Sequence, residues 1–150
     1  MAEKTTMVDD AQEKDELVLE DNQLVCALTN KVVKATDKEL TLQSMIDMMA
    51  EEYGFAPEDM ERDFRVTYKE PDSDKCRAQA VDLAIFDAGM AHVVDNLIRF
   101  VVVAKDAKVK PTDAKKGVDA MLDNILTFTD CEFGCWTNGE DLHYRYYTED

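Results

Sequence analysis

Acidic and basic residues follow directly after one strongly apolar segment of the chain. Residues 99–113 read RFVVVAKDAKVKPTD, so the β-forming run FVVV leads into Lys105, Asp106 and Lys108. Carboxylates bind Mg²⁺, and a lysine beside them helps to position a water for attack on a phosphodiester. Val103, two residues before Lys105, stands where such a site needs a carboxylate. Three interpretations follow: a site whose acid has moved to Asp106, a site that no longer works, or a buried strand with a polar end.

Two more acids are candidates for the same site. Asp82 lies near the start of the apolar segment VDLAIFD, and Glu39 lies in an expected helix. Strand alternation puts Asp82 on one face with Ala84 and Phe86, where a carboxylate needs a cation or hydrogen-bond donors. If the two strands are neighbours, Asp82 approaches Lys105, and this set of acids with a lysine suits Mg²⁺. The alternative is that Asp82 caps a turn and Lys105 extends into solvent from a strand end.

The composition indicates one domain in an aqueous compartment. The chain has 150 residues, of which 45% are hydrophobic, enough for a single core. No apolar run approaches the roughly 20 residues of a membrane span, and the first residues, MAEKTTMVDDAQEKDE, are unlike a signal peptide. We therefore expect a cytoplasmic protein, or one inside a virion.

The chain is strongly acidic, with 17 basic and 33 acidic residues and a net charge of −16. Such a balance argues against a large nonspecific nucleic-acid surface, which needs clustered lysine and arginine. Residues 1–22 and 47–63 are the most acidic segments, whereas residues 99–116 hold six basic residues against two acids. We expect protein partners rather than DNA, and no membrane contact.

The cysteine and histidine spacing does not match a zinc site. Cys131 and Cys135 are four residues apart, but no second pair accompanies them, and both histidines are isolated. Free thiols are the expectation, with a disulfide or a metal as the alternatives.

The first half of the chain predicts a helix followed by three strands. Thr36 or Asp37 is a plausible N-cap for a helix that runs through Tyr53 and ends at Gly54. Strands are expected at residues 62–68, 80–87 and 97–105, and LVCALTNKVVK before the helix is a hairpin or an extended lead-in. The expected core-facing helix residues are Leu40, Leu42, Met45, Ile46, Met48 and Met49.

The second half predicts a helix followed by a hairpin. Pro111 begins the helix, Thr112 or Asp113 caps it, and strands follow at residues 133–137 and 142–147 with a turn at Asn138-Gly139. Because a helix joins the third and fourth strands, we expect these two to be parallel. The fold class is α/β or α+β, a mixed sheet of about five strands flanked by two helices. The expected core-facing residues of this helix are Val118, Met121, Leu122, Ile125 and Leu126.

Five segments, taken in order, carry a family resemblance. They are VCALTNKVVK leading into the first helix, EEYGFAPEDMERDFRV, RAQAVDLAIFD, FVVVAK followed by VKPTD, and WTNGEDLHYRY. From about residue 24 to residue 147 the chain resembles the N-terminal nuclease domain of type I restriction enzyme R subunits, a branch of the PD-(D/E)XK nucleases. The resemblance implies a restriction-endonuclease-like core over residues 22–150 and a Mg²⁺-dependent site for DNA cleavage.

The resemblance also implies residue roles. The helix glutamate of the family corresponds to Glu39, the strand aspartate to Asp82 and the lysine of the Glu-x-Lys motif to Lys105. The glutamate of that motif falls on Val103, so one carboxylate of the family site is missing.

Other family positions are also replaced. The glutamine and tyrosine of the later helix fall on Ala120 and Asn124, and an arginine of the first helix falls on Leu42. Asp106 and Lys108 reproduce the acid-x-lysine spacing, but a shift of three residues reverses the facing and adds roughly 10 Å along a strand. The resemblance therefore implies the fold with a degenerate site.

Our leading hypothesis is a noncatalytic protein of this fold that binds other chains of an assembly, either a phage or mobile-element structure or a restriction or defence complex. No cofactor is then expected. One alternative is an active nuclease that uses Glu39, Asp82, Asp106 and Lys105 or Lys108, with Mg²⁺ on Asp82 and Asp106. A second alternative is an acidic DNA mimic, which only the net charge supports.

Two surface segments are candidate binding elements. Residues 1–21 form an expected acidic flexible arm, whose apolar anchor for a neighbouring chain is Leu17, Val18 and Leu19. The second segment is aromatic, and either stacks on bases or packs across a hairpin. Its residues are Trp136, Tyr144, Tyr146 and Tyr147.

Overall fold

A computed structural model of the chain describes residues 19–72 and 74–146. A short hairpin precedes the first helix, and a sheet with a second helix follows. The elements are β1 (Gln23–Val25), β2 (Val32–Lys34), α1 (Asp37–Glu51), the 3-10 turn η1 (Pro57–Asp59), β3 (Met60–Lys69), β4 (Cys76–Phe86), the 3-10 turn η2 (Val94–Asn96), β5 (Leu97–Val103), α2 (Val118–Phe128), β6 (Phe133–Thr137) and β7 (Leu142–Tyr146).

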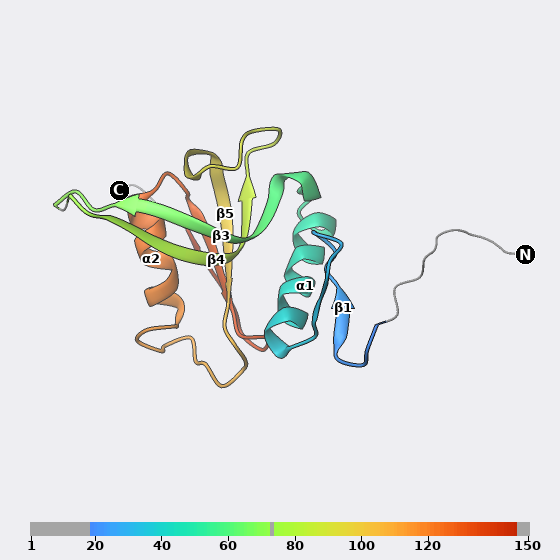
Figure 1. Cartoon of the computed structure of the whole chain (residues 1–150). Coiled ribbons are helices and arrows are strands. Elements are labelled where there is room, and N and C mark those ends of the chain that lie inside the picture. Colours follow the sequence, from blue (N-terminus) through green and yellow to red (C-terminus); the bar gives the residue numbers. More distant parts are fainter. Residues whose placement is uncertain (1–18, 73, 147–150) are drawn as a thin grey trace, which may run out of the picture.

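A mixed five-stranded sheet with the order β3-β4-β5-β6-β7 forms the centre of the fold. Only its β5–β6 pair is parallel; the other neighbours are antiparallel. The prediction of a parallel pair joined through a helix is therefore confirmed. The helices α1 and α2 lie on opposite sides of the sheet, which gives three layers (Figure 1).

Strand alternation divides the core between the two helices. In β5, Phe100 and Val102 pack with α2, whereas Val101 and Val103 pack with α1. All four side chains are buried. Because both faces of β5 are covered, its unbroken apolar sequence is the pattern of a central strand.

Helix α1 begins where the sequence indicated. Thr36 is the N-cap, and its side chain accepts a hydrogen bond from the Glu39 N–H. The helix ends at Glu51, two residues earlier than predicted, and Gly54 then takes the left-handed conformation with φ +75°. Leu42, Met45, Ile46 and Met49 are buried as predicted, but Leu40 is half exposed.

Helix α2 begins at Val118, so the predicted start at Pro111 to Asp113 is wrong. The Asp113 carboxylate accepts from the N–H groups of Lys115 and Lys116 and therefore caps a turn instead of the helix. Gly117 precedes the helix with an extended backbone and ends this irregular loop. The predicted core face of the helix is confirmed, since Val118, Leu122, Ile125 and Leu126 are buried and Met121 is partly buried.

The strands differ from prediction mainly at their ends. Strands β3 and β4 extend beyond the predicted 62–68 and 80–87 into a long hairpin, and β5 ends at Val103 instead of residue 105. The lead-in before α1 is a hairpin, β1–β2. The predicted turn at Asn138-Gly139 is confirmed, with φ +96° at Gly139.

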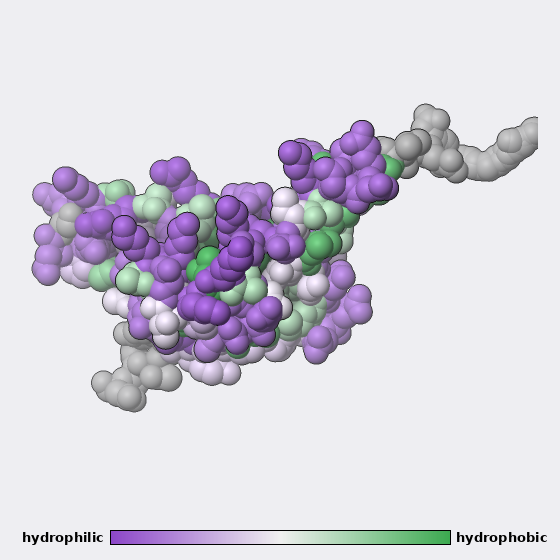
Figure 2. Space-filling view, turned by 90° about the horizontal axis from the view of Figure 1, so that it is seen from below, coloured by the Kyte–Doolittle hydropathy of each residue, from purple (hydrophilic) through white to green (hydrophobic). Residues whose placement is uncertain are grey.

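Hydrophilic side chains dominate the face of the molecule seen in Figure 2, with small hydrophobic patches between them. No helix among the described residues is long and apolar enough to span a membrane.

Candidate functional site

The strands β4 and β5 separate at the position of Asp82. Their backbone pairing ends at Leu83 and Val101. Beyond this point the Asp82 carboxylate accepts a hydrogen bond of 2.7 Å from the Val103 N–H. In a continuous β4–β5 pair, this N–H would donate to a backbone carbonyl of β4 instead. Asp63, across from Asp82 on β3, has φ +55° and is skipped in the β3–β4 register. Asp82 therefore lies at a break in the sheet, next to Val103, the residue that the resemblance aligned with the motif glutamate.

The cation beside Asp82 is Lys38, not Lys105. The Lys38 Nζ lies 2.9 Å from Asp82 Oδ1, and the Asp82 side chain is 13% exposed. Lys38 belongs to the first turn of α1, so Asp82 joins helix to sheet. Lys105 is exposed, and no described residue forms an ion pair with it, so the expected approach of Lys105 to Asp82 is wrong. Strand alternation predicted that Asp82 shares a sheet face with Ala84 and Phe86. Next to the break at Asp63, however, the Asp82 carboxylate points to Lys38 of α1 and to the end of β5.

Glu39 is bound by an arginine that lies far from it in the sequence, on strand β3. Arg62 of β3 donates two hydrogen bonds to the Glu39 carboxylate, 2.8 Å and 2.7 Å long, and Gln43 donates a third of 2.7 Å. These charge-assisted bonds hold the pKa of Glu39 below its usual value and raise the pKa of Arg62. The Glu39 side chain is only 10% exposed, so its charge is satisfied inside the protein.

Cys26 completes this cluster. Its Sγ lies 3.3 Å from Arg62 Nη1, and its side chain is fully buried. Burial alone would raise the pKa of the thiol, but hydrogen bonds from Gln43, Thr29 and Arg62 outweigh burial and lower that pKa to about 6. The sequence offered one weak signal for the cluster, namely an arginine and an acid, Arg62-Asp63, inside a strand of the sheet.

Asp106 and Lys108 belong to a turn after β5. The Asp106 carboxylate accepts a 2.9 Å hydrogen bond from the Lys108 N–H, and the Asp106 carbonyl accepts from the Val109 N–H. Asp106 therefore stabilises its own turn. Val103 is 3% exposed and packs in the core beneath α1. Within residues 19–72 and 74–146, no group of three or more His, Cys, Asp or Glu side chains is arranged to hold a metal ion.

The Mg²⁺ that the resemblance implied does not fit the residues present here. A hard cation needs several free oxygens. Asp82 is already bound by an ammonium group and an N–H, Glu39 is held by a guanidinium, and position 103 is a valine. Each candidate acid has an internal donor in the place of a metal ion.

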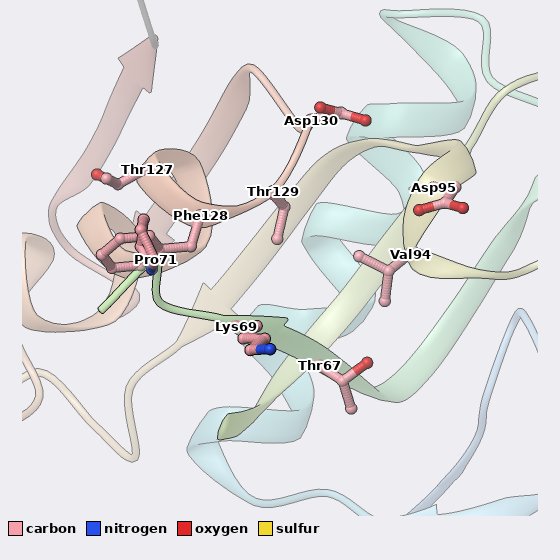
Figure 3. Close-up of a pocket in the computed structure, with 9 residues that line it drawn as sticks. All are labelled: Thr67, Lys69, Pro71, Val94, Asp95, Thr127, Phe128, Thr129 and Asp130. Carbon is pink, nitrogen blue, oxygen red and sulfur yellow. The ribbon is translucent and has the colours of Figure 1, made fainter. Parts of the chain in front are cut away.

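One cavity lies away from the candidate site. Figure 3 shows this pocket between the end of β3, the turn η2 and the C-terminal end of α2. Its volume is about 480 Å³. Its charged lining residues are Lys69, Asp95 and Asp130, and none of the predicted site residues contributes to it. This pocket is therefore not part of the candidate site.

The predictions for the aromatic residues, the cysteines and the arm anchor have different outcomes. Trp136 is fully buried and donates to the Lys116 carbonyl, whereas Tyr144 and Tyr146 are exposed and pack on Phe133 across the hairpin. All four cysteines are free. Leu19 of the proposed arm anchor is 40% exposed; Leu17, Val18 and Tyr147 lie outside the described residues.

Comparison with known proteins identifies the family. The model of the type I restriction enzyme R protein N terminus (HSDR_N) matches residues 37–150, more than half of the chain. No curated protein and no solved structure matches the chain. The five-stranded mixed sheet between two helices agrees with the PD-(D/E)XK-like fold that the resemblance implied. The chain therefore belongs to the family of type I restriction enzyme R protein N-termini, with a nuclease-like domain.

Proposed function

We propose that this protein has the nuclease-like fold without DNA cleavage, and that it acts as a binding subunit of a larger assembly. The observation that carries the proposal is the set of contacts around Asp82. Its carboxylate accepts from the Val103 N–H and pairs with Lys38, while Val103 supplies no ligand oxygen. The acid that would hold the metal instead joins α1 to the end of β5.

A metal ion at these acids would have to displace two internal cations. Binding through Asp82 and Glu39 requires that Lys38 and Arg62 give up their carboxylates. Removing one partner from a buried ion pair costs on the order of 3–5 kcal/mol, and the nearly buried Arg62–Glu39 pair approaches this case. With valine at position 103, too few oxygen ligands remain for the binding of a metal ion to offset that cost.

The net charge of −16 favours protein partners over nucleic acid. Phosphate backbones are repelled by such a field, whereas a basic protein surface is attracted. The assemblies that fit are a restriction or defence complex, in keeping with the family, or a phage or mobile-element structure.

Metal titration tests the proposal directly. Calorimetry of the full chain with Mg²⁺ or Mn²⁺ at millimolar concentration should show no saturable binding, and supercoiled and linear DNA should remain uncut with either ion. A stoichiometric site that the Asp82→Asn variant removes would overturn the proposal and favour the active nuclease.

The Val103→Glu variant tests the missing ligand. Because Val103 is buried beneath α1, an unpaired glutamate there should destabilise the protein by about 3 kcal/mol or more in urea unfolding. Mn²⁺ should not restore this stability. Tight Mn²⁺ binding by the variant would mean that only the valine separates this chain from an active site.

A further inference from the structure

An exposed aromatic surface lies where the end of α1 meets the β6–β7 hairpin. We call it the tyrosine face, defined as Tyr53, Phe133, Tyr144 and Tyr146. The rings of Tyr144 and Tyr146 lie 5.5 Å and 4.8 Å from that of Phe133, and the hydroxyls of Tyr53 and Tyr144 are 3.4 Å apart. The exposed fractions are 45% for Tyr53, 37% for Tyr144 and 67% for Tyr146. These contacts hold the rings in place while much of their surface stays open.

The side chain of Arg99 packs against the aromatic rings that form this surface. Its guanidinium lies over the rings of Phe133, Tyr53 and Phe55, at 3.9 Å, 4.7 Å and 5.1 Å from their centroids. Within the described residues Arg99 has no carboxylate partner and otherwise contacts the Met49 sulfur. A cation stacked between aromatic rings is a rigid support. The tyrosine face is therefore ordered in advance, which lowers the entropic cost of binding.

Among the strands of residues 19–72 and 74–146, β7, which carries Tyr144 and Tyr146, is an edge of the sheet. An edge strand presents unpaired N–H and C=O groups that can pair with another extended segment. The opposite edge, β3, has the left-handed residue Asp63 and a charged sequence, MERDFRVTYK, both of which discourage pairing. No residue of β7 has positive φ. Its only ion pairs among described residues join Arg145 to Asp119 and Asp123 of α2, away from the tyrosine face.

Acidic side chains border the tyrosine face. Asp47, Glu51 and Glu52 line a shallow groove on α1 together with Met48, and the Met48 sulfur contacts the Tyr144 hydroxyl. Glu132, exposed, precedes Phe133. The sequence has no lysine or arginine between Lys38 and Arg62. The charge of this surface therefore complements a basic ligand.

We infer that the β7 edge and the tyrosine face bind an extended segment of a partner protein that carries lysine or arginine. The segment pairs as an added strand on β7. Its basic side chains lie over the tyrosine rings and near Glu51 and Glu52, where cation–π contacts and charge attraction act together. This inference rests on the proposed binding function and names its surface and the chemistry of its partner.

Defined peptides test the inference on the full chain. The probe is a fluorescein-labelled peptide of about ten residues, the length of a long strand, with alternating lysine and valine; the same peptide with glutamate for lysine is the control. Fluorescence anisotropy should show saturable binding of the lysine peptide, weakened by salt, and none of the glutamate peptide. Amide hydrogen exchange of residues 142–146 should slow when the lysine peptide binds, because an added strand protects edge amides.

Matched variants locate the surface. Tyr144→Ala with Tyr146→Ala should weaken binding by about tenfold or more, as expected for two anchor aromatics. Glu51→Gln with Glu52→Gln should weaken it by about threefold and reduce the salt dependence. The control with the same charge change, Asp72→Asn with Asp74→Asn in the β3–β4 turn, should bind normally. Circular dichroism must show that all variants keep the native fold.

Three outcomes would overturn the inference: no binding of the lysine peptide, equal binding of both peptides, or binding unchanged by the tyrosine variant. Dimerisation through β7, or preferential binding of single-stranded DNA to this face, would also overturn it. None of these results bears on metal binding. Failure here with no Mg²⁺ site leaves the noncatalytic proposal standing, whereas a functional metal site refutes that proposal whatever the peptides do.

Discussion

Glu39, which the resemblance aligned with a family glutamate, is held by an internal ion pair with Arg62. Arg62→Ala would leave Glu39 with only Gln43 as a donor in a nearly buried position. We expect a loss of roughly 2–4 kcal/mol in the free energy of unfolding, slightly below the fully buried case. Glu39→Leu with Arg62→Met removes both charges and should cost less than Arg62→Ala alone. Urea denaturation measures both, and a double variant less stable than Arg62→Ala would contradict this account.

The Cys26 thiol gives the same cluster a dependence on pH. Its pKa is about 6 when folded and 9.0 in a model thiol, so between these values the unfolded chain binds the extra proton. The free energy of unfolding should therefore rise as pH increases from 6 to 9, and this contribution is lost as pH falls through 6. Cys131 and Cys135 stay protonated in this window, because burial raises their pKa values to about 11 and about 12.

Urea unfolding at several pH values checks the Cys26 prediction. The Cys26→Ala variant should show a smaller rise in stability between pH 6 and 9, and the exposed Cys76 provides the control variant Cys76→Ala. Equal slopes for the two variants would show that the thiol remains protonated.

Among the elements, the loop between β5 and α2 depends most on tertiary contacts. Trp136 donates to the Lys116 carbonyl, Asn138 donates to the Val109 carbonyl, and the Val118 N–H bonds to the Pro111 carbonyl. A Cβ on Gly117 would lie 2.3 Å from the Pro111 oxygen. The loop can close only with glycine at this position.

The Gly117→Ala variant tests this closure. The steric conflict with backbone should destabilise the protein by about 2 kcal/mol or more. It should also speed trypsin cleavage after the loop lysines, whose side chains are already exposed, because the loop backbone must open to relieve the conflict. Limited proteolysis and urea unfolding measure the two effects. Gly89→Ala is the control, because a Cβ there meets no atom within 4 Å, although its φ of +75° carries a small cost of its own. Equal trypsin sensitivity of the two variants would contradict a specific role for Gly117.

At the scale of the whole molecule, the acidic N-terminal segment, residues 1–21, carries the prediction of a partner-binding arm. Asn22 already belongs to the ordered domain, since its carbonyl accepts from the Ala35 N–H. We expect a chain beginning at Asn22 to keep nearly the melting temperature of the full chain and to lose affinity for a basic partner surface. Differential scanning calorimetry tests the first statement, and salt-dependent binding to a partner tests the second. A melting temperature lower by many degrees would make the segment a structural part of the domain.

The order of the elements and the two faces of the core follow from the sequence alone. Local patterns sufficed for this: the Thr36 cap, the helical spacing in α1 and α2, the apolar run of β5 and the Asn138-Gly139 turn. The resemblance aligned Val103 with the glutamate of the family motif, and this alignment stays a prediction. The start of α2 was missed because Asp113 caps a turn or a helix equally well by local rules.

The contacts of Asp82 and Glu39, the acids that the resemblance assigned to the site, follow from tertiary packing. Lys38 reaches Asp82, and Arg62 reaches Glu39, because packing of α1 on the sheet brings residues together that lie far apart in the chain. Local propensity carries no information on such distances. A carboxylate in an apolar layer must find a charge partner, and which cation supplies it depends on the side chains that packing places within about 4 Å.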